Sequence, residues 1–187
     1  YIVDSAGQKG TGRWTSLESL KQGVNVSMIT AACNARIMSN RLEQRAEAKK
    51  VIPGPKITEA VPKTDSRKET FANLVREGLY AAKIVAYAQG FDLLFHASAE
   101  YGWNLDFGRI AAIFRAGCII QAEFLNDITR AFEKNPKLNN LILDEFFLDK
   151  ISRNQESLRK VLSCGILSGI PMPAMSQAAA YLDAFRG

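Results

Sequence analysis

The sequence predicts an all-α fold, a multi-helix domain, and three observations support this. Apolar residues recur at three- and four-residue steps along most of the chain, as helices that face a core require. Proline and glycine gather at a few separated points, and no segment alternates apolar and polar residues as a half-buried strand would. A length of 187 residues with 47% hydrophobic and 23% charged residues is ordinary for one globular domain.

Two helices are predicted after a glycine-rich opening. Thr15 and Glu18 have the spacing of a capping box, which predicts a helix that begins at Thr15 and ends near Gly23. Residues 25–50 contain neither proline nor glycine, so one long helix is expected, buried first and solvated later. The charged run over residues 43–50 is interpreted as a solvated helix face.

A loop and a second long helix follow. Residues 51–66 are predicted to be irregular because they contain three prolines, Pro53, Pro55 and Pro62. The apolar pattern resumes over residues 66–101 and continues through Gly90, and Gly102 is expected to end this helix.

Shorter helices are predicted in the last third of the chain. Asn104 or Asp106 is expected to cap a helix that reaches Phe114. Asn135 and Pro136 end another helix, and a Gly169–Pro173 segment breaks the chain before the last one. The predicted ranges are 118–132, 138–147, 151–167 and 175–185.

The charge pattern disfavours a nucleic-acid partner. The net charge of +5 comes from 24 basic and 19 acidic residues, which are scattered and do not form a basic stripe with interleaved aromatics. Part of this excess can serve a small anionic substrate, because a cleft lined with positive charge concentrates anions.

Membrane, metal and disulfide chemistry are not expected either. No apolar run approaches the ~20 residues that span a bilayer, and no signal-peptide pattern opens the chain. Cys33, Cys118 and Cys164 are widely spaced, with His96 as the single histidine, which disfavours a zinc site and a disulfide framework. A reducing, cytoplasmic location is expected. His96 itself is expected to be a packed or partly exposed residue.

The glycine-rich segment G-Q-K-G-T-G, residues 7–12, has the chemistry of an anion site. Its glycines let backbone amides approach an anion, Lys9 supplies positive charge and the hydroxyl of Thr11 donates a hydrogen bond. The glycine spacing fits neither a Walker loop nor the G-x-G-x-x-G of a dinucleotide site. A flexible turn with a solvated lysine is the alternative that the pattern alone leaves open.

A longer segment that contains this loop resembles a known family. Residues 2–14, I-V-D-S-A-G-Q-K-G-T-G-R-W, are similar position by position to the signature of the decarboxylating 6-phosphogluconate dehydrogenases. The similarity extends over essentially all 187 residues. Its further landmarks are the segments Tyr80–Ile84, Tyr87–Phe91, Phe114–Ile120 and Gly169–Pro173.

The resemblance implies that residues 1–187 are the C-terminal helical domain of an NADP-dependent oxidoreductase, with substrate-binding and dimerisation roles. That enzyme converts 6-phosphogluconate to ribulose 5-phosphate in the pentose phosphate pathway and acts as a homodimer. The residues implied to bind the substrate phosphate are Lys9, Thr11 and Arg36, the last within Cys33–Arg36. A planar guanidinium suits bidentate phosphate contact.

The resemblance also implies that key groups lie outside this sequence. The Rossmann domain that mainly binds NADP, and the catalytic lysine and glutamate, are expected upstream of Tyr1. A tail with an arginine and a histidine is expected beyond Arg186. No catalytic residue is therefore assigned here, and the 187 residues alone are expected to be inactive. Gln121 replaces an arginine found in many relatives. The alternative function is a non-catalytic helical dimerisation or interaction module.

Overall fold

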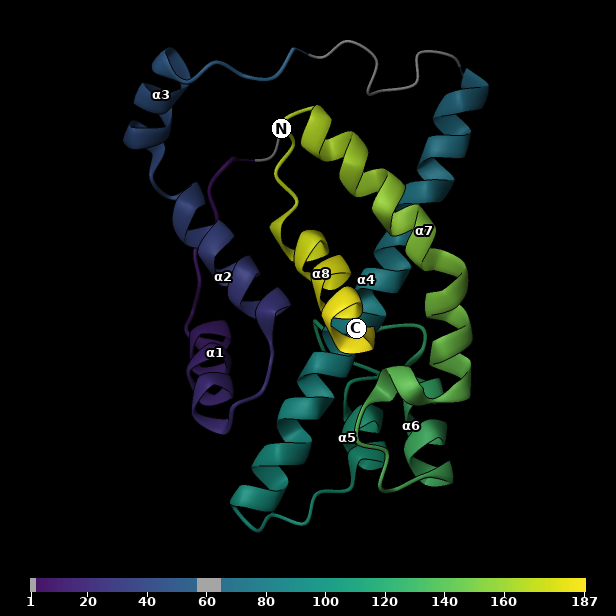
Figure 1. Cartoon of the computed structure of the whole chain (residues 1–187). Helices are drawn as coiled ribbons and strands as arrows, with labels where there is room; N and C mark the ends of the chain where they lie inside the picture. Colours follow the sequence, from purple (N-terminus) through teal and green to yellow (C-terminus); the bar gives the residue numbers. More distant parts are fainter. Residues whose placement is uncertain (1–2, 57–64) are drawn as a thin grey trace.

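The computed structural model describes residues 3–56 and 65–187, with side chains from residue 70 onward in the second range. Every regular element in these ranges is helical, which confirms the all-α prediction (Figure 1). The elements are α1 Thr11–Gln22, α2 Ser27–Ser39, α3 Leu42–Val51, α4 Asp65–Glu100, α5 Phe107–Ile113, α6 Leu125–Lys134, the 3₁₀ turn η1 Leu141–Leu143, α7 Glu145–Leu167 and α8 Pro173–Arg186.

Helix α4 is the axis of the molecule. Figure 1 shows it running diagonally across the molecule and crossing α7, with α1 and α2 on the left of the view. Helix α8 contacts both α2 and α4, and α5 packs against α6 at the far end from α3. The prediction of one helix over residues 66–101 is confirmed, because α4 continues through Gly90 to Glu100.

The centre of the core is the ring of Phe124, which is 2% exposed. Tyr80 and Tyr87 of α4 meet it edge to face at centroid distances of 5.6 and 5.2 Å, and Phe147 of α7 does so at 5.8 Å. Such aromatic pairs contribute about 0.5–1.5 kcal/mol each beyond the burial of area. The cluster therefore joins α4, α7 and the turn before α6.

Helices α4 and α7 approach each other closely at Gly78. A Cβ atom added there would lie 3.0 Å from the Cα of Leu158 and 3.2 Å from its backbone nitrogen. Only a residue without a side chain lets the two backbones meet at this distance.

Helix α1 begins earlier than predicted. Gly10, with a φ of 115°, is the N-cap residue, so the capping box at Thr15 is wrong. The hydroxyl of Thr15 instead donates to the carbonyl of Thr11, 2.8 Å away. The predicted end is confirmed, because Gly23 adopts a left-handed conformation and its amide bonds to Leu20.

The single helix predicted over residues 25–50 is also wrong, since α2 ends at Ser39 and α3 begins at Leu42. The side chain of Asn40, between them, bonds to the backbone of Ala6, which lies 34 positions away. This contact is not visible in local periodicity. The exposed second half was predicted correctly, because α3 buries none of its residues.

Two boundaries in the last third differ from the prediction. Residues 118–124 form turns and irregular segments and not helix. The side chain of Ile119 is fully exposed, so burial does not favour a helical turn at this residue, and Phe124 is buried without being helical. The predicted helices over 138–147 and 151–167 are replaced by η1 and one helix, α7, because Asp144 caps Phe146 at 3.0 Å.

Other predictions near the chain's turns are confirmed, with one shifted boundary. Asp106 caps α5 by accepting from the amide of Arg109 at 3.0 Å. Helix α8 begins at Pro173, two residues before the predicted start, because proline is tolerated in the first turn of a helix. Residues 53–56 are not helical, whereas Pro62 lies outside the described residues. None of the helices in the described ranges has both the length and the apolar character that a membrane span needs.

We predict that Gly78→Ala destabilises the protein. Alanine favours the helix by about 1 kcal/mol, but overpacking against the backbone of Leu158 costs about 1–3 kcal/mol. Gly90→Ala is the matched control in the same helix, because nothing lies within 4 Å of its added Cβ. Urea denaturation should give a lower free energy of unfolding for Gly78→Ala and an equal or higher one for Gly90→Ala. Equal effects of both changes would contradict the close approach.

Candidate functional site

The three predicted phosphate-binding residues lie on two neighbouring helices. Lys9 precedes α1, Thr11 is the first residue of α1, and Arg36 lies in the last turn of α2; all three are exposed. The first turn of α1 rests directly on α2, because a Cβ atom added to Gly12 would lie 2.5 Å from the sulfur of Cys33. The glycine at this position thus lets the loop approach the helix that carries Arg36.

Arg36 joins the loop to α2 by a hydrogen bond. Its Nε atom donates to the carbonyl oxygen of Gly7 at 2.5 Å. Among the hydrogen bonds of the described residues, this is the one that the side chain of Arg36 donates. The two terminal nitrogens of the guanidinium have further N–H groups, which can form a fork toward a planar or tetrahedral anion. The same side chain can therefore hold the loop and present donors beside it.

The start of α1 adds backbone donors to this site. The first amide bonded within the helix is that of Trp14, which donates to the carbonyl of Gly10 at 2.9 Å. The amides of Thr11, Gly12 and Arg13 precede it, and such unpaired amides at a helix N-terminus favour an anion. Lys9, the Thr11 hydroxyl and these amides are donors that lie within five consecutive residues.

The segment before the loop is attached to the end of α2. The amide of Ala6 donates to the hydroxyl of Ser39, and the carbonyl of Ala6 accepts from the side chain of Asn40, each at 3.0 Å. The hydroxyl of Ser5 also donates to Asn40 Oδ1 at 2.5 Å. Since these bonds precede Gly7 by one or two residues, they limit where the glycine loop can lie.

Arg45 of α3 reinforces this attachment. One of its terminal nitrogens, Nη1, donates to the carbonyls of Asp4 and Ser39, both at 3.0 Å. The other terminal nitrogen pairs with the carboxylate of Asp4. The interpretation of residues 43–50 as a merely solvated face is therefore wrong for Arg45, whose side chain is 34% exposed.

The other end of α2 is held by a buried side chain of α4. Gln89 is 0% exposed; its Oε1 accepts from the amide of Met28 at 3.1 Å and its Nε2 donates to the hydroxyl of Ser27 at 3.2 Å. Val26, the N-cap residue of α2, has no side-chain oxygen that could accept these amides. The side-chain amide of Gln89, from α4, caps α2 in its place.

The last turn of α1 is held as well. The hydroxyl of Tyr101 donates to Glu18 Oε1 at 2.6 Å and accepts from Lys21 Nζ at 2.5 Å. The Tyr101 hydrogen bond, followed by one from Gln22, lowers the pKa of Glu18. The Tyr101 hydrogen bond also raises the pKa of Lys21. The first turn of α1 is thus held against α2, and the last turn of α1 is held by Tyr101, which directly follows α4.

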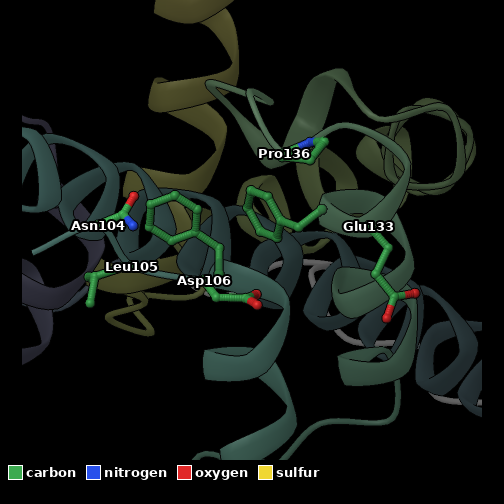
Figure 2. Close-up of a pocket in the computed structure, with 7 residues that line it drawn as sticks. Asn104, Leu105, Asp106, Glu133 and Pro136 are labelled. Atoms are coloured by element: carbon green, nitrogen blue, oxygen red, sulfur yellow. The ribbon is translucent and has the colours of Figure 1, made fainter.

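A separate cavity of about 340 Å³ lies between the start of α5 and the end of α6, and Figure 2 shows its lining. The carboxylates of Asp106 and Glu133 contribute to it, beside Asn104 and the rings of Phe107 and Phe132. Its charged residues are acidic, so it does not suit a phosphate group. The cavity shares no lining residue with the glycine loop.

His96 behaves as the sequence predicts. Its side chain is 48% exposed, and Nδ1 lies 3.0 Å from the carbonyl and 3.2 Å from the carboxylate of Asp92. Burial raises the pKa of Asp92, and the nearby His96 acts in the opposite direction. Within the described ranges, no group of three or more histidine, cysteine, aspartate or glutamate side chains is placed to hold a metal ion.

Sequence reasoning missed the residues that support the site. Arg45, Asn40 and Gln89 have polar side chains of ordinary helical sequence, and no local pattern distinguishes them from solvated ones. In the sequence, the signal that could have pointed to Arg45 is its ion-pair partner Asp4, which lies in the segment that resembles a family signature. Gln121 is exposed, and its amide donates to the carbonyl of Cys118 in the turn before it.

Comparison with protein families places this arrangement in context. The sequence profile described as "6-phosphogluconate dehydrogenase, C-terminal domain" matches residues 1–187. Decarboxylating 6-phosphogluconate dehydrogenases of Mus musculus and Homo sapiens are 45% and 44% identical to the chain over 185 residues. The matched region is 99% of this chain and 38% of each relative, so the chain spans well under half of their length.

A solved structure gives the same result for the fold. The 6-phosphogluconate dehydrogenase of Plasmodium falciparum superimposes with a TM-score of 0.87 at 39% identity, covering 100% of this chain and 39% of that one. That enzyme is known in its apo form, in complex with its cofactor NADP+ and in complex with its substrate 6-phosphogluconate.

The contact between Gly12 and Cys33 generates a prediction. Gly12→Ala should push α1 from α2 and lower the free energy of unfolding by about 1–3 kcal/mol, the usual cost of overpacking. Cys33→Ala should restore much of this loss in the double variant, because it removes the sulfur that the new Cβ meets. Urea denaturation of the two single variants and the double variant measures the coupling. Additive effects would show that the two residues are not in contact.

Proposed function

The chain belongs to the 6-phosphogluconate dehydrogenase family, and we propose that residues 1–187 form the C-terminal helical domain of a decarboxylating member. In this proposal the domain binds the phosphate end of the substrate and mediates dimerisation. The protein that carries it is an oxidoreductase of the pentose phosphate pathway. It oxidises carbon 3 of 6-phosphogluconate with reduction of NADP and releases the carboxylate as CO2, which leaves ribulose 5-phosphate.

The hydrogen bond from Arg36 to Gly7 is the observation that supports the phosphate site most directly. It brings a guanidinium from α2 to the loop that carries Lys9 and Thr11. Lys9 supplies a mobile positive charge, Thr11 a hydroxyl donor and Arg36 a planar pair of donors, which together suit a phosphate dianion. The exposure of these side chains leaves them accessible to a small ligand.

NADP is proposed as the cofactor of the whole protein, and none of the residues described here is assigned to it. A dinucleotide site of the Rossmann type needs a strand, a G-x-G-x-x-G turn and a helix. The described ranges contain no strand, and the glycines of the loop, Gly7, Gly10 and Gly12, have a different spacing. The residues present do not fit the cofactor, so the proposal gives them only substrate binding.

A cytoplasmic location belongs to the same proposal. The thiols of Cys33 and Cys118 are half-buried and not joined in a disulfide, which suits a reducing compartment.

We predict that Lys9→Ala and Arg36→Ala each weaken binding of 6-phosphogluconate by about tenfold or more. The reason is that one charge-assisted hydrogen bond contributes about 1.5–3 kcal/mol. Isothermal titration calorimetry on the 187-residue chain measures the dissociation constant. Lys137→Ala is the matched control, because Lys137 is exposed beyond α6 and lies outside the loop and its neighbours. Unchanged affinity in Lys9→Ala and Arg36→Ala would remove these residues from the site.

We predict that the chain forms a homodimer in solution. Large apolar side chains are exposed along one helix, with Trp14, Leu17 and Leu20 of α1 at 62%, 61% and 80%. Extended apolar patches on a protein surface are typical of interfaces, and homodimers most often pair identical surfaces about a twofold axis. Sedimentation equilibrium should give about twice the chain mass of 20.6 kDa. A single species of 20.6 kDa at high protein concentration would contradict dimerisation by these residues.

A further inference from the structure

Arg45 differs from the other charged residues of α3. Lys50 pairs with Glu47 one turn away within the same helix, at 2.8 Å, which is typical of a solvated face. Arg45 instead reaches two other parts of the chain, the segment at Asp4 and the end of α2 at Ser39. It therefore connects the segment at Asp4 with the end of α2 and with α3.

The bonds to backbone carbonyls matter more than the ion pair. The carboxylate of Asp4 is 80% exposed, and a pair of this kind contributes little in water. The carbonyls of Asp4 and Ser39 are fixed parts of the main chain, and Nη1 of Arg45 lies 3.0 Å from both. Because the guanidinium is rigid and planar, it fixes these two carbonyls relative to each other.

The Asp4 carbonyl leads into the glycine loop. Lys9 lies five residues after Asp4, and two of the residues near it, Gly7 and Gly10, lack the side chains that restrict backbone conformation. The bonds of Asn40 and Ser39 to Ala6 act at the same place. With the Arg45 bridge they leave the loop little freedom to move away from α2.

We propose that Arg45 is a positioning residue of the phosphate site, which holds the segment before the loop so that Lys9 and Thr11 stay beside Arg36. Arg45 touches no substrate in this proposal and acts through the main chain of Asp4. The inference rests on the proposed function, because it assumes that the loop binds the phosphate of 6-phosphogluconate. Misplacement of a binding group by a fraction of an ångström weakens its contacts, and supporting residues prevent this.

The test uses Arg45→Ala in the 187-residue chain, with 6-phosphogluconate and inorganic phosphate as probes. We expect both dissociation constants to rise about fivefold, with an unchanged thermal midpoint, because a mispositioned loop weakens binding without loss of the core. Exchange of the Ala6 amide with solvent should become faster, since its bond to Ser39 Oγ depends on the held segment. A purely structural role would instead lower the thermal midpoint and speed exchange throughout α2.

Three further variants make the result specific. Lys50→Ala removes the same charge from the same helix and should bind both probes as the unmodified chain does. Asp4→Asn keeps the carbonyl that Arg45 holds, so its effect should stay below about twofold, the small contribution of an exposed ion pair. Arg45→Lys keeps the charge but loses the rigid planar guanidinium, whose two terminal nitrogens bond to both carbonyls and to the Asp4 carboxylate, so it should give an intermediate constant. It also serves if Arg45→Ala does not fold.

The outcomes separate this inference from the proposed function. If Lys9→Ala weakens binding while Arg45→Ala and Arg45→Lys do not, the positioning role is wrong and the phosphate site remains. Equal losses in Lys50→Ala and Arg45→Ala would also overturn the positioning role, because charge alone would then explain them. If Lys9→Ala binds as the unmodified chain does, the phosphate site itself is wrong.

Discussion

The buried amide of Gln89 caps the start of α2 and ties it to α4, and the proposed phosphate site lies at the other end of α2. Gln89 is inaccessible to solvent and bonds to Ser27 and to the amide of Met28, so it replaces the cap that Val26 cannot provide. A buried amide that lost these partners would leave polar groups unsatisfied, at a cost of about 1–3 kcal/mol. Helix α2 is therefore fixed to α4, which the cluster around Phe124 holds in the core.

The site is built from exposed groups that take their positions from buried or partly buried ones. Lys9, Thr11 and Arg36 are open to solvent, as a site for a small soluble anion must be. Their placement comes from the contact of Gly12 with Cys33 and from the bonds at the end of α2. The phenol of Tyr101 fixes the far end of the same helix, α1. In the proposed site Arg36 both holds the loop and offers donors, whereas Gly12, Asn40 and Tyr101 give support alone.

The net charge of the whole domain does not locate the proposed phosphate site. The net charge of +5 is spread over the surface, and the cavity at α5 and α6 is lined by carboxylates. A phosphate is favoured where backbone amides, a lysine and a guanidinium converge, which depends on geometry more than on total charge. In the proposed function, the glycine loop together with Arg36 provides this combination.

The sequence by itself determined the helical class, the length of α4, the chemistry of the glycine loop and the family. Each of these is recorded locally, in a repeat of three and four residues or in a continuous motif. Only the tertiary structure decided that Gly10 caps α1, that α2 ends before Asn40 and that Asp144 caps α7. It alone also showed that Gln89 and Arg45 join segments around the candidate site. The physical reason is that most of these features depend on side chains that meet across long stretches of sequence, 34 residues for Asn40 with Ala6 and 61 for Gln89 with Met28.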